Sequence, residues 1–138
     1  RKLMTEKVSL IRNRNKVKQV IDFTGVQNGN MHPSDIDAVL EFDNEVLILI
    51  EVKYKFNSIP TGQRLLLERL CDSWHTGKSL VLKVEHEFNS DDTNIPLEEC
   101  WVTGVYHDKK WVYYTDKVGF VTYINALGRK WNCSKCKF

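Results

Sequence analysis

The chain has no long apolar run and few cysteines, and both absences exclude classes of protein. No segment approaches the roughly 18 consecutive apolar residues of a membrane-spanning helix, and the basic N-terminus is not followed by the apolar core of a signal peptide. The four cysteines, at positions 71, 100, 133 and 136, are too few and too unevenly spread for a secreted disulfide scaffold. We therefore expect a cytoplasmic protein that has no membrane partner.

Composition and length favour one folded domain over residues 1–138. The chain of 138 residues is 42% hydrophobic and 28% charged, which is typical of a globular domain and not of a disordered one. A chain of this length buries roughly two-thirds of the surface that its unfolded form exposes. No internal repeat, low-complexity tract or linker divides it.

Charge is unevenly distributed along the chain, although the net charge is only +2. Residues 1–19 contain seven Lys or Arg and one acid, and residues 126–138 contain four Lys or Arg and no acid. The segment between them contains nine basic and seventeen acidic residues. Basic ends suit binding along a polyanion such as DNA, and they also serve simply to keep a protein soluble.

Strand-type and helix-type patterns alternate, which predicts an α/β fold. Glycine, asparagine and proline mark a loop over residues 25–34, and Asp43-Asn44 marks a hairpin turn. We expect helices over 3–13, 63–77 (ended by Gly77) and 117–128, and a loose basic tail after them. We expect strands over 17–24, 35–42, 45–55 and 78–88, and a second hairpin formed by 100–106 and 110–116.

Charged residues interrupt the most apolar of these strands. Glu51 and Lys53 follow Leu47 to Ile50, and because strand side chains alternate they point to one face, as Asp35 and Asp37 do on the neighbouring strand. Buried charges must be paired, hydrated or bound to a metal. Clustered carboxylates suit a hard divalent cation, so this pattern predicts a Mg²⁺ site, whereas Glu51 and Lys53 alone would form an ordinary ion pair.

The segment "SDIDAVLEFDNEVLILIEVKYK" resembles the core of the PD-(D/E)XK nucleases. In that superfamily an acid on one strand and an acid-x-Lys on the next build a magnesium-dependent phosphodiesterase site. The segment looks most like the small Holliday-junction-resolvase-like and VRR-type nucleases, over about residues 20–88. The resemblance implies a restriction-endonuclease-like core, in which a mixed β-sheet is flanked by helices.

The resemblance also implies roles for individual residues. Asp37 and Glu51 would bind Mg²⁺, or Mn²⁺ as a substitute, together with the backbone carbonyl of Val52. Lys53 would orient or help deprotonate the attacking water, and Gln63 would position that water or a phosphate oxygen.

Two further acids are candidates by the same resemblance. Some members add a Glu from the first helix, where Glu6 is the only acid. Asp35 is the alternative ligand to Asp37, because Ser34 separates Pro33 from Asp35 and no literal Pro-Asp occurs. We choose Asp37 because three apolar residues follow it directly.

The expected function is that of a Mg²⁺-dependent DNA endonuclease, selective for branched or recombining DNA. Its small size would suit a phage gene, and symmetric cutting of two strands would require a homodimer. The alternatives are an inactive nucleic-acid-binding module with a nuclease fold and a sequence-specific restriction endonuclease. Separately, Cys133-x-x-Cys136 is either half of a zinc site or a pair of free thiols.

Overall fold

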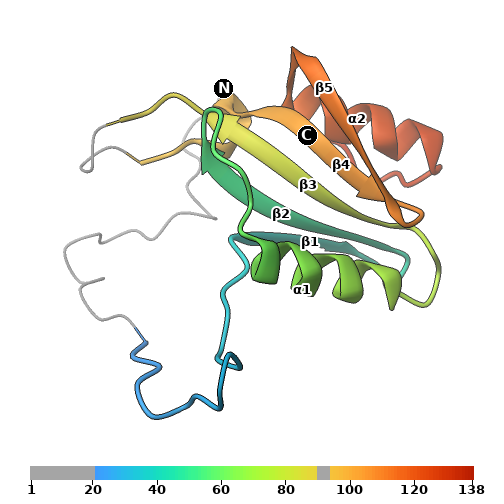
Figure 1. The fold of residues 1–138 in the computed structure, drawn as a ribbon. Helices are drawn as coiled ribbons and strands as arrows, with labels where there is room; N and C mark the ends of the chain where they lie inside the picture. The colour runs from blue at the N-terminus through green and yellow to red at the C-terminus, as the bar shows by residue number, and fades with distance from the viewer. Residues whose placement is uncertain (1–20, 90–93) are drawn as a thin grey trace. The chain divides into compact units, whose positions relative to one another are not determined.

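The computed structural model describes residues 21–89 and 94–138 (Figure 1). The chain divides into two units, residues 1–34 and residues 35–138, which are described separately. The expected helix over residues 3–13 lies outside the described residues, as does Glu6.

In the first unit, the described residues 21–34 form turns and no strand. The Asp22 carboxylate accepts hydrogen bonds from the backbone N–H of Thr24 at 2.9 Å and from its hydroxyl at 2.6 Å. Asn28 and Met31 form an isolated bridge. The strand expected over 17–24 is therefore wrong for residues 21–24, because a side chain that bonds the backbone two residues ahead stabilises a turn.

The second unit contains a mixed five-stranded sheet in the order β1-β2-β3-β4-β5, in which only β2 and β3 are parallel. The sheet carries two helices, so the predicted α/β class with a mixed sheet is confirmed (Figure 1). The elements are β1 Ala38–Phe42, β2 Val46–Tyr54, α1 Thr61–Asp72, β3 Ser79–His86, the 3₁₀ turn η2 Leu97–Glu99, β4 Trp101–His107, β5 Lys110–Gly119 and α2 Phe120–Lys130.

Both predicted hairpins are present, and each turns on two residues with left-handed backbone. Asp43 and Asn44 have φ of 50° and 61°, and the N–H of Glu45 bonds the carbonyl of Phe42 at 2.8 Å. Asp108 and Lys109 have φ of 51° and 66° in the turn between β4 and β5. Positive φ at both central residues matches the right-handed twist of the flanking strands.

Helix α1 connects the parallel strands β2 and β3, and it ends earlier than the sequence predicts. It ends at Asp72, not at Gly77, which has a φ of +75° in the turn before β3. Trp74 and Thr76 donate side-chain hydrogen bonds to the carbonyl of Glu45, at 2.9 Å and 2.5 Å. These contacts with a residue distant in sequence stabilise the turn and end the helix.

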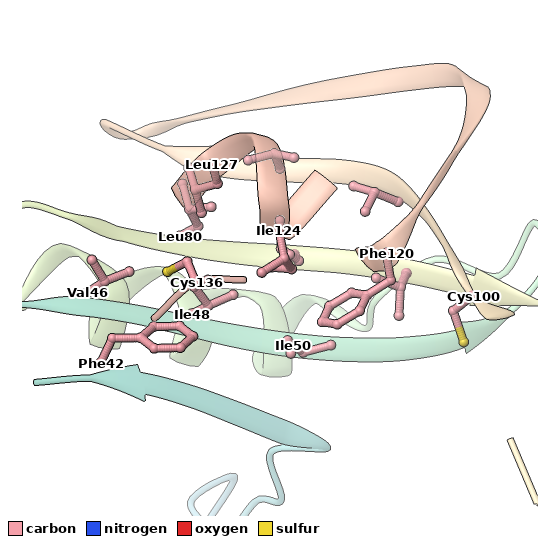
Figure 2. Close-up of a cluster of buried hydrophobic side chains, with 14 residues drawn as sticks. Phe42, Val46, Ile48, Ile50, Leu80, Cys100, Phe120, Ile124, Leu127 and Cys136 are labelled. Carbon is pink, nitrogen blue, oxygen red and sulfur yellow. The ribbon is translucent and has the colours of Figure 1, made fainter. Parts of the chain in front are cut away.

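Apolar residues cover both faces of the sheet. On one face, Leu67 and Cys71 of α1 pack on Leu49, Val81 and Tyr106. On the other face, α2 packs over the alternate residues of the same strands, and Figure 2 shows this larger cluster. Its labelled members are Phe42, Val46, Ile48, Ile50, Leu80, Cys100, Phe120, Ile124, Leu127 and Cys136.

The C-terminal tail packs against α2, so the prediction of a loose tail is wrong. Cys136 is only 2% exposed and belongs to the α2-side core (Figure 2). Gly128 permits this approach, because a Cβ on it would lie 2.3 Å from the Cys136 carbonyl oxygen. Within the described ranges, no helix is both long and apolar enough to cross a membrane.

Candidate functional site

The β1–β2 hairpin places an acid from each strand at the same level. Ala38 pairs with Ile50 in the antiparallel register, so Asp37, just before β1, lies beside Glu51. Paired residues of adjacent strands point to the same face, and Glu51 shares the face of Leu49, which α1 covers. Asp37, Glu51 and Lys53 therefore meet on the α1 face, where β2 ends.

Glu51 is a buried carboxylate with one oxygen paired and the other unpaired. Its residue is 1% exposed, and Oε2 lies 3.0 Å from the Nζ of Lys53. Among residues 21–89 and 94–138, no hydrogen-bond partner reaches Oε1. Leaving a buried polar atom without a partner costs roughly 1–3 kcal/mol, and more for a charged group. An orphaned oxygen of this kind is therefore a position that a ligand would satisfy.

Burial raises the pKa of Glu51. The hydrogen bond from Lys53 opposes this increase, whereas the neighbouring charge of Asp37 adds to it. The buried carboxylate of Glu51 therefore lies next to the exposed carboxylate of Asp37, and the two repel each other. A bound cation would relieve both the repulsion and the desolvation of Glu51.

Asp37 is tied to β2 through the backbone. Its Oδ2 accepts a hydrogen bond from the Val52 N–H at 2.8 Å, across the hairpin. The bond holds the backbone between Glu51 and Lys53 in place and fixes one oxygen of Asp37. Asp37 itself is exposed, so its carboxylate can also serve as a ligand. The proposed role of the Val52 carbonyl stays a prediction.

Gln63 is the third residue of α1 and reaches the segment just before β1. Its Nε2 lies 3.4 Å from the carbonyl oxygen of Asp35, which is a long hydrogen bond. The backbone of Asp35 thus joins Gln63 to the site, while the carboxylate that acts on Glu51 is that of Asp37. Pro60 precedes α1. In the described structure, no side chain caps the first turn of this helix. The backbone N–H groups of that turn therefore remain available to an anion.

A second charged pair lies beside the first and was missed from the sequence. In the parallel register Glu51 pairs with Lys83 and Lys53 pairs with Glu85, so Glu51-Val52-Lys53 runs next to Lys83-Val84-Glu85. Lys83 Nζ lies 2.9 Å from Glu85 Oε2, and both side chains are largely buried. The sequence does contain a signal for this pair, because the order of acid and lysine is reversed between the two strands. That signal indicates a contact only when the register of the two strands is known.

Glu85 is fully engaged by its neighbours, unlike Glu51. Its carboxylate accepts hydrogen bonds from Lys83, from the Phe56 N–H at 3.0 Å and from the Thr103 hydroxyl at 3.0 Å. Burial would raise the pKa of Glu85, but these three donors outweigh it and lower the pKa. Glu85 is therefore a structural anion, and Glu51 is the carboxylate with spare capacity.

The oxygen-rich donor set fits a hard divalent cation in part. Asp37 and Glu51 supply two carboxylates, and in the residues that the structure describes no group of three or more His, Cys, Asp or Glu could hold a metal ion. Mg²⁺ commonly binds through one or two carboxylates and keeps several waters, with substrate phosphates completing its shell. The unpaired Oε1 of Glu51 is the observation that fits such an ion.

The two tail cysteines do not complete a zinc site within the described part of the chain. Cys133 and Cys136 are free thiols, with their sulfurs 3.1 Å apart. No third ligand from residues 21–89 or 94–138 joins them, whereas a structural zinc needs four ligands. Within the described residues the pair therefore stands as two free thiols.

Comparisons of the chain with protein-family models, with curated proteins and with solved structures gave no match.

Proposed function

We propose that this protein is a Mg²⁺-dependent endonuclease that hydrolyses phosphodiester bonds in DNA. The observation that carries the proposal is Glu51, a buried carboxylate with one oxygen paired to Lys53, one oxygen unpaired and a second carboxylate opposite it. A stable protein gains nothing from an orphaned buried oxygen. The arrangement is accounted for if a cation occupies the position.

The proposed site divides the work among four side chains. Asp37 and Glu51 would hold the cation, which would polarise the scissile phosphate and lower the pKa of a bound water. Lys53 is 22% exposed at its side chain, so its ammonium can reach a water or a phosphate oxygen without leaving Glu51. There it would orient the attacking water and offset charge that develops on phosphorus. Gln63 would position the same water or a neighbouring phosphate oxygen.

Two features of the chain suit a DNA backbone. Beside the site, the uncapped first turn of α1 presents backbone N–H groups, which favour a phosphate. Away from the site, α2 ends with Arg129 and Lys130, and the tail that packs against α2 carries Lys135, which pairs with Asp43, and Lys137. Contacts of this kind bind phosphates without reading the sequence, so affinity for DNA should fall as the salt concentration rises. A homodimer would be needed for symmetric cutting of two strands and is part of the proposal.

The second candidate function is an inactive nucleic-acid-binding module. The ion pair between Glu51 and Lys53, at 3.0 Å, favours this candidate, because such a pair can stabilise the fold without taking part in catalysis. The unpaired Oε1 argues against it, because a module without catalysis has no use for that oxygen. A restriction endonuclease is the third candidate, and it would cut plain duplex at one sequence.

Cleavage of a labelled panel of DNA tests the proposal. Single strand, duplex, flap and four-way junction would be incubated with Mg²⁺, Mn²⁺ or EDTA, using the wild type, Lys53→Ala and Lys109→Ala. Lys109 is the control, because it is also a lysine paired with an acid, Asp72. It lies in the β4–β5 turn, at the end of the sheet opposite to the candidate site. We expect cutting by the wild type and by Lys109→Ala that EDTA abolishes, and a loss on the order of 100-fold in Lys53→Ala.

Each other outcome has a defined meaning. Circular dichroism and thermal melting would establish that Lys53→Ala is folded, and Lys53→Gln would serve if it is not. No cutting of any substrate by folded wild type with either metal would overturn the proposal in favour of the binding module. Cutting of plain duplex at one sequence would favour the restriction enzyme.

A further inference from the structure

Phe56 lies just beyond the end of β2 and combines an exposed side chain with a firmly held backbone. It is 89% exposed and follows Lys53 by three residues. Single exposed apolar side chains are common on proteins and alone imply nothing. The conformation of Phe56 and the bonds that hold it make this residue different.

The backbone of Phe56 is left-handed, with a φ of 67°. The N–H of Asn57 bonds the carbonyl of Tyr54 at 3.0 Å, so Phe56 is the third residue of a four-residue turn. A positive φ at that position normally belongs to glycine or asparagine, because a Cβ is strained there. A bulky aromatic residue in this conformation therefore calls for an explanation beyond the turn itself.

Hydrogen bonds to β3 hold the backbone at Phe56 and at the residue before it. The N–H of Phe56 donates to Glu85 Oε1 at 3.0 Å, and Glu85 is in turn fixed by Lys83 and Thr103. The preceding residue, Lys55, continues the ladder with an N–H bond to the carbonyl of His86 at 2.9 Å. The fold thus fixes the backbone rigidly while it leaves the ring in solvent.

The anchor of Phe56 is also a neighbour of the candidate site. Glu85 is the register partner of Lys53, and it lies on the α1 face with Glu51. Phe56 therefore lies on the turn that leaves β2, three residues after Lys53, at the end of the strand that carries the candidate site. An exposed aromatic ring next to a phosphate site suits a base that has left the stack, because every base offers a π face.

We propose that Phe56 stacks on an unpaired base next to the cleaved bond. The inference rests on the proposed function and names a residue of the same site that determines its specificity. Paired bases inside a duplex already stack on their neighbours, so Phe56 would add nothing to the binding of a blunt duplex. Phe56 is in this account a residue that determines specificity, and it takes no part in the chemical step.

Binding measured in EDTA tests the inference without any cleavage. The probes are a fluorescein-labelled duplex that carries a single-stranded flap and a blunt duplex of the same sequence, each titrated with the full chain by fluorescence anisotropy. We expect the wild type to prefer the flap, Phe56→Ala to lose about tenfold in flap affinity and Phe56→Trp to retain it. Affinity for the blunt duplex should stay unchanged in all of them.

Two more variants separate stacking from other roles of the side chain. Phe56→Leu keeps apolar bulk without a π face, and we expect it to bind the flap as weakly as Phe56→Ala. Phe56→Asn suits the left-handed backbone, and we expect it to melt at a higher temperature than the wild type while it loses the flap preference. A lower melting temperature for Phe56→Asn would mean that the ring serves the fold, which would overturn the inference.

The remaining outcomes distinguish the two proposals. Flap affinity in Phe56→Leu or Phe56→Ala equal to that of the wild type would overturn stacking and leave the nuclease proposal standing. A folded wild type that binds both DNAs equally would do the same. A wild type that binds neither DNA would overturn the proposed function as well.

Discussion

Asp37 and Val52 are joined across the β1–β2 hairpin by a hydrogen bond of 2.8 Å, from the Val52 N–H to Asp37 Oδ2. The bond links the acid before β1 to the backbone between Glu51 and Lys53. One carboxylate thus has a structural role and a proposed role in cation binding, and variants can separate the two.

Asp37→Asn and Asp37→Ala should differ in stability but not in cleavage. The asparagine side chain keeps an oxygen for the Val52 N–H, so the free energy of unfolding of Asp37→Asn should stay within about 0.5 kcal/mol of the wild-type value. Asp37→Ala loses this hydrogen bond, so its free energy of unfolding should fall by about 1 kcal/mol. Both remove the charge, and we expect both to reduce cleavage on the order of 100-fold. Urea unfolding and the flap assay measure the two effects. Full cleavage by Asp37→Asn would mean that the carboxylate charge is not needed.

Glu51→Gln should stabilise the protein and abolish cleavage. In the absence of metal, the amide avoids the burial of a charge with an unpaired oxygen, so the free energy of unfolding at neutral pH should rise by roughly 1 kcal/mol. Lys53, which is partly exposed, can turn to water when its partner is lost. Urea titration of both proteins in EDTA measures the change. A marked loss of stability would show that Glu51 serves the fold through its pair with Lys53.

Glu85 should make the stability depend on pH in acid solution. Its pKa is lowered in the folded protein, so it contributes stability above the ordinary glutamate pKa of about 4.5, and this contribution is lost as pH falls through the lower folded value. At neutral pH we expect Glu85→Gln to be about 1–3 kcal/mol less stable than the wild type, since Lys83 loses its partner. The difference should shrink as pH falls below about 4.5, because the unfolded state takes up the proton first and the folded state follows at its lower pKa. A difference that stays constant with pH would contradict the assignment of Glu85 as a structural anion.

Gly128→Ala should destabilise the protein and Gly62→Ala should not. A Cβ at Gly128 would lie 2.3 Å from the Cys136 carbonyl oxygen and 2.7 Å from its Cβ, so the tail must move, at a cost of roughly 1–3 kcal/mol. Gly62, in the first turn of α1, has no atom within 4 Å of the same position. Alanine favours a helix over glycine there, by up to about 1 kcal/mol. Thermal melting of the two variants checks both signs, and equal effects would contradict the packing of the tail.

The sequence predicts the local features of this fold better than the contacts between distant segments. Residues that are close together in the sequence determine the Asp43-Asn44 turn and the two strands that it joins. The approach of Asp37 to Glu51 follows from the same hairpin. The end of α1 at Asp72 does not, because it depends on bonds from Trp74 and Thr76 to a carbonyl that is distant in sequence.

The parts of the site that the sequence missed have the same cause. The Lys83–Glu85 pair lies beside Glu51 and Lys53 only through the parallel register of β2 and β3. The left-handed conformation of Phe56 depends on Glu85, which lies on another strand. No composition or spacing near Phe56 would have indicated it.

Asp37 and Glu51 are proposed to hold a divalent cation together. Titration of the protein with Mn²⁺, followed by the electron paramagnetic resonance signal of the free ion, measures this directly, with no substrate present. We expect the wild type to bind Mn²⁺, and we expect Glu51→Gln and Asp37→Asn, both folded, to bind it at least about tenfold more weakly. Binding by Glu51→Gln equal to that of the wild type, or no binding by the folded wild type, would contradict this proposal.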